Sequence, residues 1–135
     1  MIILDSSFII AYYNTADNNH NKAVEIMRDL RAGEYGDIFI TDYLFDEIVT
    51  VAFVRLKNLN KTVEIGEAVN SLAKIDYIGK DIFEATWKLF KYQTGTKFSF
   101  TDCSTLSMMK KNGIKNIATF DEDFKKVKEI SVVSG

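Results

Sequence analysis

The chain opens with Met1-Ile2-Ile3-Leu4-Asp5-Ser6-Ser7, an apolar run that ends at a carboxylate and two hydroxyls. This pattern predicts a buried strand over residues 1–4, followed by a helix from Ser6 to Tyr13. A second stretch near the other end repeats the arrangement, since Asp121 follows Ile117-Ala118-Thr119-Phe120. If the two strands are parallel, Asp5 and Asp121 leave the sheet at its carboxyl edge, where open α/β sheets form ligand sites.

Strands and helices alternate along the rest of the chain. After a polar loop over 14–21 we expect helix 22–31, strand 38–40, helix 42–58, helix 62–74, strand 75–78, helix 80–92, helix 100–112, strand 117–119, one turn over 121–126 and strand 130–133. This order predicts a mostly parallel sheet with right-handed crossovers and helices on both faces. The expected fold is a three-layer α/β/α fold with a central sheet of about five strands, in a single domain over residues 1–135.

The composition is that of an ordinary globular protein. Hydrophobic residues make up 47% and charged residues 27% of the 135 residues, which is far from the signature of disorder. No apolar run approaches the roughly 20 residues of a membrane span, and Asp5 interrupts the first run before it could serve as a signal-peptide core. We therefore expect a cytoplasmic protein without membrane contact.

The charge balance restricts how the protein could contact nucleic acid. A formal net charge of −2 argues against non-specific coating of nucleic acid. A local basic rim remains available from Lys110, Lys111, Lys115, Lys125, Lys126 and Lys128.

Two further acids join Asp5 and Asp121 as candidates for chemistry. Glu47 lies in the apolar segment 43–54, and most of its helical neighbours three and four residues away are apolar. Burying a lone carboxylate there costs several kcal/mol unless a cation or a donor compensates. Asp102 opens a helix after Ser99-Phe100-Thr101. Carboxylates that converge at one edge repel one another unless a cation lies between them, and a hard divalent metal is the natural occupant.

Each acid also has a structural interpretation. Asp5 could cap the helix that begins at Ser6. Ser99 and Asp102 fit the pattern of a capping box, and Thr119 with Glu122 could form another beside Asp121, with Asp123 as a competing carboxylate. For Asp42 and Asp46 we favour a solvated edge of the helix.

The other reactive residue types are scarce. The single cysteine, Cys103, excludes an internal disulfide, and with the single histidine, His20, it cannot build a structural zinc site. We expect His20 to be a structural residue at a helix start and Cys103 to be packed inside a helix. Any metal must then be held by oxygen, and a nucleophilic or histidine-based mechanism is poorly supplied.

These residues resemble the PIN-domain family, and within it the VapC-type toxins of bacterial and archaeal toxin–antitoxin pairs. The likeness covers essentially the whole chain. The matching segments are Ile3–Ser7, His20–Ala23, Glu47 within its helix, Ser99–Asp102 and Thr119–Phe124. Each segment is a weak signal alone, but their order and spacing are specific.

The resemblance implies an endoribonuclease that hydrolyses RNA phosphodiester bonds with Mg²⁺ or Mn²⁺ and leaves a 5′-phosphate. Asp5, Glu47, Asp102 and Asp121 would form the acidic cluster that holds one or two metals, with Ser6, Thr119 and Asp123 around it. Asp123 is also an alternative to Asp121 as the fourth acid. The family further implies a cognate antitoxin near the acidic cleft and a homodimer. The apolar helix from Asp42 to Leu56 is expected to lie partly at an interface.

Three other functions compete with this interpretation. A receiver-like phosphoacceptor module needs paired acids after the first strand and a lysine after the last pocket strand, whereas Asp5 is followed by serines and Thr119 by Phe120-Asp121. A non-catalytic RNA-binding scaffold would not need an intact set of four carboxylates. An RNA-processing PIN nuclease without a toxin role is not separable from a toxin by sequence, although an antitoxin reading frame just upstream would separate them.

Overall fold

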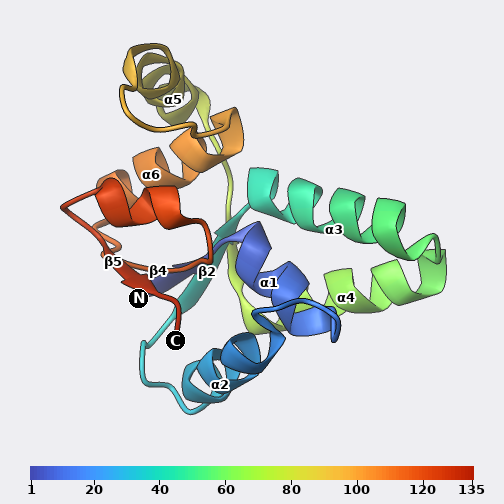
Figure 1. The fold of residues 1–135 in the computed structure, drawn as a ribbon. Helices are drawn as coiled ribbons and strands as arrows, with labels where there is room; N and C mark the ends of the chain where they lie inside the picture. The colour runs from blue at the N-terminus through green and yellow to red at the C-terminus, as the bar shows by residue number, and fades with distance from the viewer.

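The computed structural model describes residues 1–135 and contains one parallel sheet. Its strand order is β3-β2-β1-β4-β5, and every pairing is parallel (Figure 1). The strands are β1 (Ile2–Leu4), β2 (Ile38–Thr41), β3 (Lys74–Asp76), β4 (Asn116–Ala118) and β5 (Ser131–Val133). The predicted parallel sheet of about five strands is confirmed.

Helices cover both faces of the sheet. They are α1 (Ser6–Tyr13), α2 (His20–Arg31), α3 (Asp42–Leu56), α4 (Leu59–Leu72), α5 (Lys80–Tyr92), α6 (Phe100–Asn112) and the 3₁₀ helix η1 (Glu122–Lys126). Figure 1 shows α1 to α4 on one side of the sheet and α5, α6 and η1 on the other. This confirms the three-layer α/β/α arrangement. No helix is both long enough and apolar enough to cross a membrane.

The middle of the sheet is covered on both faces, which explains the unbroken apolar run at the N-terminus. Ile2, Ile3 and Leu4 are each 0% exposed and belong to a core cluster of 24 buried residues. A strand covered on both faces favours continuous apolar sequence over alternation. Because β1 is the central strand, the residue that follows it emerges at the centre of the carboxyl edge.

The order in which strands are added to the sheet changes direction between β1 and β4. From β1 the chain adds β2 and β3 on one side, and it then adds β4 and β5 on the other side. The connection after β1 runs over one face through α1, and the connection after β4 runs over the other through η1. Since β1 and β4 are neighbours, the two connections diverge from the switch point between these strands, which is where doubly wound sheets place their ligand sites. Asp5 and Asp121 follow these two strands, which confirms that both leave the sheet at the same edge.

The ends of several elements differ from prediction by one to three residues, and the break between α3 and α4 shows why. Lys57 adopts a left-handed conformation with φ of 51°, which ends α3, and the side chain of Asn58 then accepts a hydrogen bond from the backbone of Lys61. This cap starts α4 at Leu59, earlier than the predicted Thr62. The hydroxyl of Thr62 bonds the carbonyl of Asn58 inside the helix.

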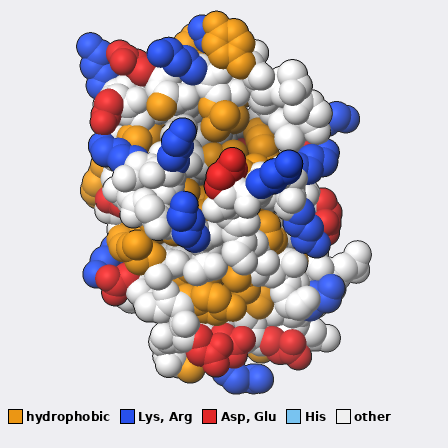
Figure 2. Space-filling model, turned by 90° about the vertical axis from the view of Figure 1, so that its left-hand side faces the viewer, with side chains coloured by type: hydrophobic (Ala, Val, Ile, Leu, Met, Phe, Trp, Pro, Cys, Tyr) orange, Lys and Arg blue, Asp and Glu red, His pale blue; other side chains and the backbone are white.

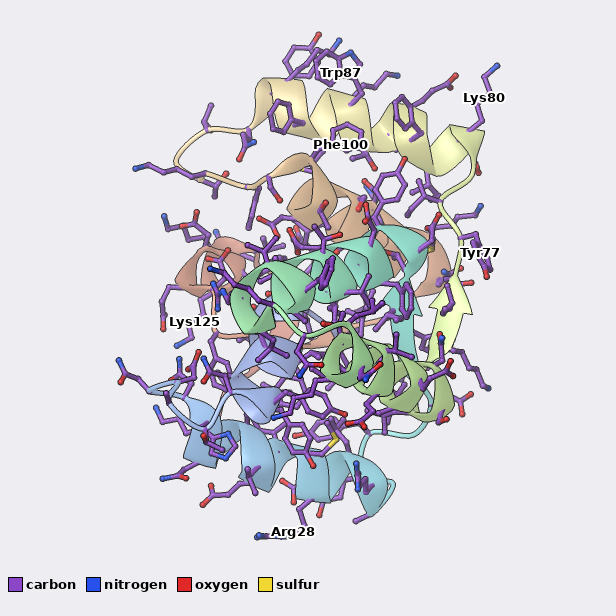
Figure 3. The ribbon with its side chains drawn as sticks, turned by 90° about the vertical axis from the view of Figure 1, so that its right-hand side faces the viewer. Arg28, Tyr77, Lys80, Trp87, Phe100 and Lys125 are labelled. Carbon is purple, nitrogen blue, oxygen red and sulfur yellow. The ribbon has the colours of Figure 1, made fainter.

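The large aromatic residues of α5 lie mostly at the surface. Ile82 and Thr86 are the buried residues of this helix, whereas Phe83 and Trp87 remain 47% exposed. Figure 3 shows Trp87 on the outer side of α5, away from the sheet. The apolar residues of α5 therefore form an exposed aromatic surface as well as a core contact.

Candidate active site at the carboxyl edge of the sheet

Asp5 is the most deeply buried of the candidate acids, with 3% exposure. It occupies the cap position of α1, yet its side chain makes no capping hydrogen bond. Instead, its Oδ2 accepts hydrogen bonds from Ser7 Oγ and from Thr119 Oγ1, each at 2.7 Å. The interpretation of the Asp5 carboxylate as a helix cap is therefore wrong, because it links α1 to the end of β4.

Thr119 and Ser7 also bind the backbone of the segment that follows β4. Thr119 Oγ1 also accepts the backbone N–H of Asp121 at 3.0 Å, and Ser7 Oγ accepts the backbone N–H of Phe120 at 3.1 Å. The two hydroxyls thus fix the segment that carries Asp121 against the start of α1. The predicted capping box between Thr119 and Glu122 is wrong, since Asp121 itself caps η1 by accepting the N–H of Asp123.

Glu47 reaches the same region from α3. It is half-buried, and its Oε2 accepts a hydrogen bond of 2.6 Å from Ser6 Oγ. This hydroxyl is the donor that the apolar surroundings of Glu47 require. Ser6 follows Asp5 directly, so the hydrogen bond brings the Glu47 carboxylate to the N-terminus of α1.

The two neighbouring acids of α3 have other roles. Asp46 is exposed and accepts a hydrogen bond from Thr50, which confirms its place at a solvated edge. Asp42 is half-buried and accepts the backbone N–H of Ile78 at 2.8 Å. The prediction of a solvated edge is wrong for Asp42, because its carboxylate holds the segment that follows β3.

Asp102 has both a structural contact and an unusual environment. It forms the predicted capping box, in which its Oδ2 accepts the backbone N–H of Ser99 and its own N–H bonds Ser99 Oγ, each at 3.0 Å. Burial raises the pKa of Asp102 to about 6, and the negative charges of Asp5 and Asp121 raise it as well. Burial likewise raises the pKa of Asp5, against the lowering effect of the Thr119 and Ser7 hydroxyls, and the charge of Asp121 adds to the rise.

The charges of Asp5, Asp102 and Asp121 therefore act on one another at this edge of the sheet. No basic side chain compensates them. The four ion pairs of the protein join Lys74 to Asp37, Lys111 to Asp81, Lys125 to Glu122 and Lys126 to Asp123. Asp5, Glu47, Asp102 and Asp121 take part in none of them.

Asp123, the competing carboxylate, points to a different contact. It pairs with Lys126 at 2.8 Å and accepts the backbone N–H of Lys97 at 2.9 Å. The hydrogen bond from Lys126, followed by that from Lys97, lowers the pKa of Asp123. Asp123 therefore secures the loop before α6, whereas Asp121 is the acid whose charge acts on Asp5 and Asp102.

The remaining reactive side chains are structural. The Nδ1 of His20 lies 2.9 Å from the carbonyl oxygen of Ala11, which ties the start of α2 to α1. Burial, and then the charge of Asp102, raise the pKa of Cys103 to about 11, so its thiol stays protonated. Both predictions of a structural role are confirmed.

The donor set of the cluster fits a hard divalent cation, since it offers only carboxylate and hydroxyl oxygens and lacks a positive charge. As the side chains stand, however, no group of three acids is close enough to hold a metal ion. A bound cation would have to draw the carboxylates together.

An open pocket of about 410 Å³ adjoins the cluster at Glu47. It is lined by Tyr43, Asp46, Glu47, Thr50, Val51, Phe100 and Thr101. The sequence interpretation did not assign a role to Tyr43, Phe100 or Ser7. For Ser7 a signal was present, because it stands two residues after Asp5 in the first strand-to-helix turn.

The strand order and the four acids, placed after β1, in α3, at the start of α6 and after β4, define a PIN-type α/β domain. The sequence model of the PIN domain family matches residues 2–130, and the chain belongs to this family. The family predicted from the motifs is confirmed.

Several characterised proteins resemble the chain. A "23S rRNA-specific endonuclease VapC20" of Mycobacterium tuberculosis is 24% identical over 124 residues, which cover 92% of each chain. A "VapC ribonuclease" of Archaeoglobus fulgidus is 25% identical over 101 residues, covering 74% of this chain and 64% of that protein. The crystal structure of VapC20 superposes with a TM-score of 0.82 at 23% identity, covering 96% of this chain and 97% of that one. VapBC2 from Rickettsia felis, bound to a promoter DNA fragment, gives a TM-score of 0.71 at 14% identity, covering 98% and 97%.

The raised pKa of Asp102 predicts a pH-dependent stability of the metal-free protein. The folded state holds the Asp102 proton up to about pH 6, whereas the ordinary pKa is 3.8, so this group stabilises the fold at low pH and the contribution is lost as pH rises through that window. In EDTA, the difference in melting temperature between Asp102→Asn and wild type should therefore shift in favour of the variant as pH rises from about 4 to about 7. Asparagine can still accept the hydrogen bond from Ser99.

Asp81→Asn is the matched control for this measurement. Asp81 is exposed, and its hydrogen bond with Lys111 lowers its pKa, so its small contribution has the opposite sign and is lost as pH falls. A difference between Asp102→Asn and wild type that stays constant over the pH range would contradict the environment described for Asp102.

Proposed function

We propose that this protein is a VapC-type endoribonuclease toxin that hydrolyses RNA phosphodiester bonds with Mg²⁺ or Mn²⁺. The observation that carries the proposal is a set of acidic side chains, Asp5, Glu47, Asp102 and Asp121, that converge at the carboxyl edge without a basic partner. Structural acids are normally paired with a basic side chain or solvated. A cluster of partly buried acids without a basic partner is typical of a metal-dependent active site.

The relatives support the nucleolytic part of the proposal. Both named proteins that resemble the chain in sequence are VapC nucleases, one of them specific for 23S rRNA. Membership of the PIN domain family also removes the receiver-like alternative.

The side chains have separable tasks in the proposed reaction. Asp5, Glu47, Asp102 and Asp121 would hold the cation, which supplies Lewis-acid activation of water and neutralises charge on the phosphate when it is bound. Ser7 and Thr119 orient Asp5 by donating to its Oδ2, and Ser6 orients Glu47. Hydroxyl donors are suited to this task because they fix the carboxylates without cancelling their charge.

The same proposal includes protein partners and a place of action. We propose that a cognate antitoxin covers the acidic cleft and that the protein forms a homodimer, both acting in the cytoplasm where the RNA is found. Exposed apolar side chains provide surfaces for such contacts, among them Phe53, Val54, Leu59 and Val63 on α3 and α4. Contiguous exposed apolar surface of this kind marks interaction sites in soluble proteins.

Asp5→Asn tests the role of the central carboxylate. Asparagine keeps the shape of the side chain and still accepts hydrogen bonds, but it removes one charge from the cluster. We expect RNA cleavage to be abolished while the melting temperature in EDTA stays unchanged or rises, because repulsion in the metal-free site is relieved. The measurements are cleavage of labelled RNA in Mn²⁺, in Mg²⁺ and in EDTA, together with thermal melts.

Asp29→Asn on α2 makes the same chemical change outside the cluster and should cleave like wild type. Cleavage by Asp5→Asn at a near wild-type rate would reject the catalytic role of Asp5. Cleavage by the wild type that persists in EDTA would reject the dependence on metal.

Metal binding without substrate should be weak. The acids have to move together against their own repulsion, and Mg²⁺ usually completes its shell with water and substrate phosphate. Isothermal titration calorimetry should detect little heat with Mg²⁺ and more with Mn²⁺, and none with either ion for Asp5→Asn. Tight binding of Mg²⁺ by the free protein would show that the carboxylates are already arranged as a complete site.

A further inference from the structure

We propose that the pocket beside Glu47 is a subsite for one unstacked base of the RNA substrate, and that the base it fits is guanine. The inference rests on the proposed function, because it assigns the pocket to the substrate of that nuclease site. It adds a determinant of sequence preference and assigns it to Tyr43, Phe100 and Asp46.

The pocket adjoins the proposed reaction site. The pocket shares Glu47 with the acidic cluster, and its residue Thr101 directly precedes Asp102. A nucleotide whose phosphate lies at the carboxylates therefore has this pocket within reach of its base. A volume of about 410 Å³ and an open mouth allow a base to enter from a single strand.

Two aromatic rings form part of the wall of the pocket. The rings of Tyr43 and Phe100 lie with centroids 6.3 Å apart and planes at 33°. Phe100 is supported from behind by Phe83 and Phe90, with centroids at 5.3 Å and 6.2 Å. Figure 3 shows Phe100 between α5 and the start of α6. Aromatic side chains held in this way are the usual platform on which proteins stack single-stranded bases.

The pocket is also acidic. Asp46 and Glu47 both line the pocket, so it repels phosphate and favours the base end of a nucleotide. Covering these two carboxylates with an apolar protein surface would be unfavourable. The pocket is therefore less suited to a protein partner than the apolar side chains exposed on α3 and α4.

Asp46 gives the pocket its selectivity. It is exposed and unpaired by any lysine or arginine, and its one hydrogen bond is from Thr50 to Oδ1 at 3.1 Å. A carboxylate accepts two parallel N–H donors and repels acceptors. Guanine presents two adjacent N–H donors on its Watson–Crick edge, whereas the donor of each other base is flanked by at least one acceptor.

The test uses RNA hairpins with a randomised single-stranded loop, cleaved in Mn²⁺ and sequenced at the new ends. Wild type should enrich guanine at one nucleotide flanking the cut. Asp46→Asn should reduce that enrichment at least about fivefold, the lower end of what one bidentate base contact contributes. Glu64→Gln removes an exposed acid from α4 outside the pocket and should leave the preference intact.

A second pair of variants tests the stacking wall. Tyr43→Ala should raise KM for loop cleavage at least about fivefold without changing kcat by as much, and Tyr43→Phe should restore KM because it keeps the ring. Tyr77→Ala, which removes an exposed aromatic ring that does not line the pocket, is the control. Thermal melts verify that each variant is folded.

The outcomes separate the subsite from the proposed function. Cleavage with no preference for guanine, or a preference that Asp46→Asn retains, would overturn the subsite and leave the nuclease in place. A Tyr43→Ala or Asp46→Asn protein that changes mass in sedimentation and keeps its base preference would make the pocket a protein contact. If wild type cleaves no RNA, the proposed function fails, and titration with 5′-GMP against 5′-UMP decides the subsite, with equal affinity overturning it.

Discussion

The hydrogen bonds from Ser7 and Thr119 to the buried Asp5 carboxylate determine the geometry of the carboxyl edge. The bond from Thr119 joins residues that are 114 positions apart along the chain and fastens the ends of the neighbouring strands β1 and β4. Neutral donors compensate part of the cost of burying the carboxylate but leave its charge in place. The remaining charge acts on Asp102 and is itself opposed by Asp121, so the contact that closes the fold also creates the repulsion that a cation would relieve.

Asp102 shows that a structural and a functional role need not exclude each other. Its capping box with Ser99 uses Oδ2 and fixes the side chain at the first turn of α6. A cap that only stabilised a helix would gain nothing from a partly buried site with two other acids nearby, since burial and the charges of those acids raise its pKa. The capping contact is better understood as the means by which the carboxylate is held in an unfavourable environment.

Much of this arrangement was predictable, because it follows from local patterns. The apolar runs before Asp5 and Asp121 predict strands, their alternation with helices predicts a parallel sheet, and a parallel sheet brings the two acids to one edge. The apolar helix face around Glu47 predicts that this acid needs a donor. The family resemblance placed Ser6 and Thr119 around the cluster. Their particular contacts, from Ser6 to Glu47 and from Thr119 to both Asp5 and Asp121, join distant segments, and no local pattern encodes them.

Hydrophobicity alone does not decide which side chains of a helix are buried. Trp87 and Phe83 lie among apolar residues of α5, which is compatible with a core position and with a surface that binds something. Only the packing of α5 against α6 decides that Ile82 and Thr86 face inward. The predicted start of α4 was wrong for a different reason. Lys57 adopts a left-handed conformation, which is uncommon for lysine and is not predicted by the sequence pattern.

The distribution of charge indicates how such a site could recognise RNA. Three of the six lysines considered for a basic rim, Lys111, Lys125 and Lys126, pair with acids. Figure 2 shows basic side chains spread over the face that carries β5 and η1, without a continuous block. With a net charge of −2, the protein as a whole does not attract a polyanion. Affinity for RNA must then come from short-range contacts. The cation at the carboxylates would bind the phosphate, and the aromatic pocket would bind the base. Contacts of this kind distinguish between RNA sequences, whereas a general basic surface does not.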